Sequence, residues 1–189
     1  MVKGIRKTRI KRMMKYHIQF LENSWLSKFA DYLDSIPYFT YSDNVILDEK
    51  DVLSFKYYHG NTYVLATDEN REVLGHICVI HPVNKHGYHQ EHILEVHINV
   101  LPTHHGKSIG KRLLEFFLKE VKKGNKKRGI KKIHTKMLAN NDKVIKLFES
   151  LGFKKEAVLK KEWKLLIKDK KGKDKEVYED GVYMSLFLN

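Results

Sequence analysis

The stretch that decides the fold runs from Glu95 to Leu114 and reads EVHINVLPTHHGKSIGKRLL. Apolar and polar residues alternate from residue 94 to residue 100, which is typical of a strand with one buried face. The apolar positions are Leu94, Val96, Ile98 and Val100. From Ile109 onward the apolar residues take the spacing of an amphipathic helix. The stretch therefore predicts a strand, a short glycine-bearing loop and a helix in succession.

Within this loop, Gly106-Lys107-Ser108 raises the question of a P-loop for a nucleoside triphosphate. A P-loop needs a glycine five residues before Gly106, where this sequence has Leu101. The next predicted strand also ends without an acidic residue that would hold magnesium. The sequence thus argues against a nucleoside triphosphate.

The loop is still suited to a phosphate group. A strand that leads through glycines into a helix directs free backbone N–H groups and the positive end of the helix dipole at one point. Gly106 and Gly110 allow close approach of the backbone, while Lys107, Lys111 and Arg112 add positive charge. We expect a pyrophosphate to bind here.

The bulk properties indicate one globular domain over residues 1–189. We expect its N-terminal part, at 1–58, to be helical. The chain has 189 residues and 42% hydrophobic content, enough for one core. No apolar run is long enough to span a bilayer, and the first residues lack a secretory signal, so we expect a cytoplasmic protein. The single cysteine, Cys78, lies in an apolar run and is expected to be packed.

The order of the predicted elements is that of an α/β or α+β domain with a mixed sheet. A helix, long or divided in two, is expected over 10–33, and the helix from Ile109 is expected to end at Gly124-Asn125. A short helix is expected over 142–151. The remaining patterned segments predict strands at 61–66, 72–80, 93–101, 130–138, 153–167 and 176–188.

Two motifs resemble those of a known family. EVHINVLPTHHGKSIGKRLL and, about thirty residues later, NDKVIKLFESLGF (141–153) resemble the two signatures of the GNAT superfamily of acyl-CoA-dependent N-acetyltransferases. The ending at 179–188 resembles the last strand of ribosomal-protein-type members. The resemblance covers residues 60–188, which it makes the CoA-binding core and C-terminal strands. It implies a mostly antiparallel sheet flanked by helices, with splayed central strands.

The resemblance also implies a cofactor, acetyl-CoA, and the residues that hold it. The acetyl oxygen would lie against the backbone at 98–100, the pyrophosphate in the loop, and the pantetheine arm beside Asn141, which is also the expected N-cap of its helix. The implied cofactor residues are Ile98, Asn99, Val100, His105, Gly106, Lys107, Ser108, Ile109, Gly110, Lys111, Asn141 and Phe148.

Three positions depart from the family pattern. His105 stands where the family prefers Arg or Gln, and Ser108 replaces a glycine, so we expect an unstrained backbone there, with a hydroxyl that can donate to a phosphate. Phe148 occupies the position where many members carry a tyrosine that protonates the departing thiolate. Tyr183 or water would have to replace that tyrosine.

The implied reaction is direct attack of a primary amine on the thioester in a ternary complex. A lysine with pKa near 10.4 is neutral about once in 2,500 molecules at pH 7, so a base matters more for lysine than for a protein N-terminus. Glu95 and His97 share the polar face of their strand, and either is a candidate base. The alternatives are a structural ion pair for Glu95 and a wall of the cleft for His97.

The acceptor and partners are left open by the sequence. A protein N-terminus, a lysine and a small amine all fit the implied chemistry, and a homodimer is compatible with it. The net charge of +13 supports an alternative, a basic module that binds nucleic acid or the ribosome without acetyl transfer. Its basic runs are the N-terminal arm and the lysine-rich segment at 122–132, taken as a solvated turn. The histidines at 81, 86, 89, 92 and 97 are favoured as a surface loop over a zinc site, and no metal is expected.

Overall fold

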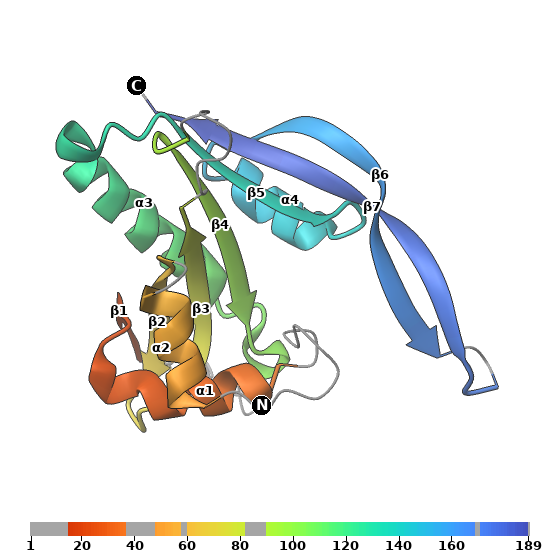
Figure 1. The fold of residues 1–189 in the computed structure, drawn as a ribbon, viewed down its shortest axis with the longest axis horizontal. Coiled ribbons are helices and arrows are strands. Elements are labelled where there is room, and N and C mark those ends of the chain that lie inside the picture. The colour runs from red at the N-terminus through yellow and green to blue at the C-terminus, as the bar shows by residue number, and fades with distance from the viewer. Residues whose placement is uncertain (1–14, 37–47, 58–59, 82–89, 169–170, 189) are drawn as a thin grey trace, which may run out of the picture.

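The seven strands of the described residues belong to one sheet with the order β1-β2-β3-β4-β5-β7-β6 (Figure 1). The computed structural model describes residues 15–36, 48–57, 60–81, 90–168 and 171–188. The strands are β1 Tyr16–Phe20, β2 Thr62–Asp68, β3 Val73–Ile80, β4 Ile93–Val100, β5 Lys132–Leu138, β6 Lys154–Lys168 and β7 Asp174–Phe187. The helices are η1 Asn23–Trp25, α1 Leu26–Asp34, α2 Glu49–Tyr57, η2 Pro102–His104, α3 Ile109–Arg128 and α4 Asp142–Glu149.

The centre of the sheet splays between β4 and β5. These two strands are parallel, whereas every other neighbouring pair is antiparallel. They pair only from Ile93↔Lys132 to Glu95↔His134, although β4 continues to Val100 and β5 to Leu138. The expected α/β domain with a mixed, mostly antiparallel and centrally splayed sheet is confirmed.

The two faces of the sheet carry different layers. On one face α3 and α4 pack against the strands around Leu113, Phe117 and Phe148. On the other face α1 and α2 cover the N-terminal half of the sheet around Phe29 and Leu33, and this second cluster includes no residue of β5, β6 or β7. That face of β5 and β7 is therefore not covered by this cluster, and the β6–β7 hairpin projects away from the body (Figure 1).

The N-terminal prediction was wrong in two ways. Tyr16–Phe20, expected to be helical, forms β1 and pairs along its whole length with β2. Its alternation sends Tyr16 and Ile18 toward the α3 side of the core, and this pairing outweighs the helical spacing of the wider segment. In this part of the described chain the helical residues begin only at η1 and α1, and residues 10–14 of the expected helix lie outside the described residues.

Helix α2 lies within the N-terminal part that was expected to be helical, but it was not predicted as a separate element. The carboxylate of Asp48 accepts hydrogen bonds from the N–H groups of Lys50 and Asp51, and Asp51 bonds back to the Asp48 N–H. This reciprocal arrangement is a capping box built from two aspartates.

Helix α3 is longer than expected. It passes through Gly124 and ends at Arg128, because the residue that takes the left-handed conformation is Gly129, with φ 67°. The lysine-rich segment at 122–128 is therefore the last turns of a helix and not a turn. No helix within the described residues is long and apolar enough to cross a membrane.

Candidate active site

Four titratable side chains form a row where β4 and β5 begin to separate. Glu95 and His97 lie on one face of β4, and His134 pairs with Glu95 across the last β4–β5 rung. Tyr183 reaches the same row from β7, where its hydroxyl is hydrogen-bonded to His134 Nδ1. The row lies on the sheet face that α1 and α2 leave uncovered at β5 and β7.

Glu95 and His97 make a direct hydrogen bond. Glu95 Oε1 lies 2.8 Å from His97 Nε2, and this bond is the main reason why the pKa of Glu95 is lowered. Glu95 is thus ionised at neutral pH and can only accept, so Nε2 of His97 carries the hydrogen. Because the His97 side chain is 40% exposed and that of Glu95 24%, the imidazole is the more accessible member, with Nδ1 as its remaining nitrogen.

His134 was not predicted as a site residue. Its side chain is 13% exposed, and burial lowers its pKa, so it is neutral at neutral pH. Its Nε2 lies 3.7 Å from Glu95 Oε2 and makes no hydrogen bond to a described residue. The available signal was the alternation of β5, which puts Lys132, His134 and Lys136 on the polar face. The register that brings β5 beside Glu95 could not be read from the sequence.

The open edge of β4 offers backbone hydrogen-bonding groups to the splay. The Leu101 N–H donates to the Leu74 oxygen of β3, and the direction of N–H groups alternates along a strand. The backbone groups of Ile98 and Val100 therefore point away from β3, into the splay, where β5 no longer pairs with them. The predicted oxyanion segment at 98–100 lies at this open edge, and His105 Nε2 contacts the Val100 oxygen at 2.7 Å.

The loop before α3 presents a run of unused donors. Arg112 N–H donates to the Ser108 oxygen, whereas the N–H groups of Gly106–Lys111 have no acceptor among the described residues. Gly106 has φ 74°, and a Cβ there would meet nothing within 4 Å, so the loop is open on that side. Consecutive free N–H groups at the start of a 20-residue helix suit a pyrophosphate, and these residues fit the expected group.

The backbone of Ser108 differs from the expectation. It has φ 61° and ψ 12°, the left-handed conformation that glycine adopts easily and serine does not. The turn into α3 holds Ser108 in this conformation, so the expected unstrained backbone was wrong. Its side chain makes no capping hydrogen bond.

The remaining predicted cofactor residues surround this loop. Gly110 lies where a Cβ would be 3.4 Å from Ile98 Cδ1 and from Leu147 Cδ2, so the start of α3 packs closely between β4 and α4. Asn141 is the N-cap of α4, as expected, but it is exposed and its side chain makes no capping bond. Phe148 is fully buried, with its ring 4.9 Å from that of Phe153. Roles for Asn141 and Phe148 in cofactor binding stay predictions.

The histidine-rich segment, expected to be a surface loop, is only partly within the described residues. His86 and His89 lie outside the described residues, and within the described part no three metal-ligating side chains come together. His81 follows the end of β3, whereas His97 lies within β4 and is bonded to Glu95.

Comparison with known proteins agrees with this geometry. The sequence profile of the acetyltransferase (GNAT) domain matches residues 59–155. A ribosomal-protein-alanine N-acetyltransferase from Brucella melitensis is similar in structure, with a TM-score of 0.68 and 20% identity over 91% of this chain and 99% of that one. Among curated protein sequences, no match was found.

Two further similar structures contain the cofactor. A putative acetyltransferase from Salmonella typhimurium with acetyl-CoA has a TM-score of 0.68 and 19% identity, covering 92% of this chain and 94% of that one. A phosphinothricin acetyltransferase from Sinorhizobium meliloti in complex with acetyl-CoA has a TM-score of 0.69 and 20% identity, covering 93% and 89%. At these identities the likeness concerns the fold. The chain belongs to the GNAT family of acetyltransferases, as the profile match over just more than half its length shows.

Proposed function

We propose that the protein transfers the acetyl group of acetyl-CoA to a primary amine by direct attack in a ternary complex. The observation that carries this proposal is the separation of β4 from β5 directly after Glu95. It leaves the backbone donors of Ile98 and Val100 beside the Glu95–His97 pair, so an oxyanion site and a base lie on one strand.

The chain's own groups have distinct tasks in this proposal. The donors of Gly106–Lys111 bind the pyrophosphate, and the free edge of β4 holds the thioester. The amine nitrogen forms a bond to the carbonyl carbon while the carbon–sulfur bond breaks and CoA leaves as a thiolate. His97 Nδ1 takes the proton of the attacking amine, and the Glu95 carboxylate stabilises the resulting imidazolium through Nε2.

The acceptor class follows from the amine's pKa. An α-amine with pKa near 7.8 is deprotonated at a cost of about 1 kcal/mol at pH 7, against about 4.6 kcal/mol for lysine. A histidine base is better suited to deprotonating an α-amine than to deprotonating a lysine side chain. We therefore place protein N-termini first among the acceptors, and the name of the Brucella melitensis neighbour points to peptides that begin with alanine.

Calorimetry and turnover test the proposal. Acetyl-CoA binding should be measurable below millimolar concentration, and CoA release should be tested with N-terminal peptides, polyamines and aminoglycosides. No binding at millimolar cofactor would refute the proposal. Replacement of His97 by Gln should reduce kcat/KM by about 100-fold or more, while an exposed histidine outside the row, His17 of β1, replaced in the same way serves as the control.

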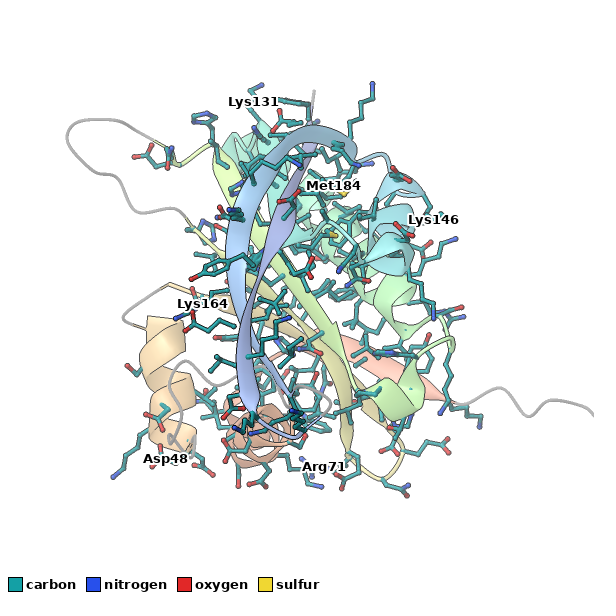
Figure 2. The ribbon with its side chains drawn as sticks, turned by 90° about the vertical axis from the view of Figure 1, so that its right-hand side faces the viewer. Asp48, Arg71, Lys131, Lys146, Lys164 and Met184 are labelled. Carbon is teal, nitrogen blue, oxygen red and sulfur yellow. The ribbon has the colours of Figure 1, made fainter. Side chains whose placement is uncertain are left out.

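A second candidate function rests on the basic end of α3. Between residues 121 and 141 the sequence has no acidic residue, and the cations of its first half lie on the last turns of α3 and just after them, namely Lys122, Lys123, Lys126, Lys127, Arg128 and Lys131. Figure 2 places Lys131 at the opposite end of the molecule from Arg71 of the β2–β3 turn. RNA binding that weakens steeply with salt and disappears on charge reversal at Lys126 and Lys127 would support this candidate.

A further inference from the structure

We propose that His134 is a positioning residue for the Glu95–His97 pair and that Tyr183 fixes its tautomer. This inference rests on the proposed function and adds two residues to its proton chemistry. In the proposed arrangement the Tyr183 hydroxyl donates to His134 Nδ1, and His134 presents its Nε2–H to Glu95 Oε2. The carboxylate then has one imidazole at each oxygen, His97 at Oε1 and His134 at Oε2.

The protonation states of the row support this arrangement. Burial raises the pKa of Tyr183 to about 12, so the phenol keeps its hydrogen and can donate it. Burial is also the main cause of the lowered pKa of His134, so the imidazole has one hydrogen to place on either nitrogen. A hydrogen on Nε2 faces the ionised Glu95, whereas a lone pair there would face a negative charge 3.7 Å away.

The second ring nitrogen of His134, Nε2, also favours this arrangement. Among the described residues, His134 Nε2 is buried without a hydrogen-bond partner, and the carboxylate of Glu95 lies across the row from it. A buried N–H group without an acceptor destabilises the fold. A small movement that shortens the 3.7 Å distance between His134 Nε2 and Glu95 Oε2 is therefore favourable. When His97 becomes an imidazolium during the reaction, Glu95 is held in place by His134 and does not rotate away.

The surroundings of His134 come from every neighbouring strand. Tyr183 bonds to its Nδ1, and Lys132 lies with its ammonium 5.1 Å from the centre of the Tyr183 ring. Lys132 is itself paired with Glu156, which also accepts a hydrogen bond from Ser185. The charged and titratable groups that act on His134 are Glu95 and His97 from β4, Lys132 from β5, Glu156 from β6 and Tyr183 from β7.

The first experiment measures the tautomer of His134 by nitrogen NMR of the full-length protein without substrate. We expect a neutral Nε2–H tautomer at pH 7 in the wild type and a mixture of tautomers in Tyr183→Phe. Tyr178→Phe removes an exposed hydroxyl farther along β7, one that bonds to Glu176 instead, and should leave the tautomer unchanged. An Nδ1–H tautomer in the wild type, or an unchanged tautomer in Tyr183→Phe, would overturn the proposal.

The second experiment is the pH profile of kcat/KM. Replacing His134 by Leu removes a positive dipole from Glu95, so its carboxylate stabilises the His97 imidazolium more strongly and the acid limb moves to higher pH, by about half a pH unit or more. Tyr183→Phe should move the acid limb in the same direction, and the double variant should move it no further than either single variant. His134→Gln, which keeps an N–H group, should give the wild-type profile.

The outcomes separate this inference from the proposed function. Additive shifts in the double variant, or lower activity in His134→Leu with an unmoved profile, would show a merely structural role for His134. If the protein fails to transfer acetyl groups while the NMR tautomers are as expected, the proposed function falls and the hydrogen-bonded row stands.

Discussion

His105 Nε2 lies 2.7 Å from the backbone oxygen of Val100, which ties the loop before α3 to the open edge of β4. The imidazole therefore connects the two parts of the cofactor site, the predicted pyrophosphate loop and the strand that would hold the thioester.

Replacement of His105 by Ala should loosen this connection. We expect a loss of about 1 kcal/mol of unfolding free energy and a several-fold weaker binding of acetyl-CoA, measured by denaturation and calorimetry. His17→Ala is the control, because His17 is exposed on β1 and is not one of the predicted cofactor residues. Equal effects of the two changes would show that the bond to Val100 has no special weight.

Ser108 supplies a test of backbone strain. Because its φ is 61°, Ser108→Gly should be at least as stable as the wild type, and Ser108→Val should lose more than about 1 kcal/mol relative to the glycine variant. Urea denaturation gives both values. Ser150 has an ordinary φ of −62° after α4, so Ser150→Gly should instead lower the stability of the protein. A stability order in which Ser108→Val equals Ser108→Gly would contradict the left-handed backbone.

Gly75 controls the position of the Asn99–Val100 peptide. A Cβ at Gly75 would lie 2.8 Å from the Asn99 oxygen, too close for the strands to stay where they are. Gly75→Ala should therefore cost about 2 kcal/mol of stability and lower kcat at least tenfold, since Val100 presents its N–H to the splay. Gly124→Ala is the control: its Cβ would be 3.7 Å from Arg128 Nε inside α3, so stability should hold or rise and kcat should not change.

His76 makes the stability of the fold depend on pH. It is fully buried, its Nδ1 lies 3.1 Å from the Tyr32 hydroxyl, and burial lowers its pKa from 6.5 to about 3. The unfolded chain binds the proton more readily than the folded one, so stability is complete above pH 6.5 and is lost as the pH falls below it. Between pH 6.5 and 5 the loss from His76 should be about 2 kcal/mol.

Denaturation at several pH values measures this slope. The slope should be flatter in His76→Gln and unchanged in His17→Gln, which alters an exposed histidine of β1. A wild-type slope in His76→Gln would assign the pH dependence to other groups.

The sequence predicted the elements that carry a repeated apolar pattern. β4, the loop, the start of α3 and α4 lie where their alternation and glycine spacing placed them, because one face of each is buried in the same core. Tyr16–Phe20 shows the limit of such patterns: over five residues, helical and alternating spacings overlap, and the pairing with β2 decides between them.

The candidate site also contains residues that the sequence predicted and one that it did not. Glu95, His97 and the loop were identified from one continuous stretch, whereas His134 joins them only through the register of two parallel strands that are far apart in the chain. Ser108 illustrates the opposite case: its position was identified, but its conformation is set by the turn and not by the side chain.

The limited pairing of β4 with β5 has a consequence for the energetics of binding. The strands already stand apart in the folded chain after Glu95, so the entry of a ligand between them breaks no strand-to-strand hydrogen bond. Any ligand that bonds to both edges would add to the strand pairing between the two halves of the sheet, β1–β4 and β5–β7, which is limited to three residue pairs in the described structure. Such a bridge should make the two halves unfold together, so thermal unfolding should be sharper with ligand than without it.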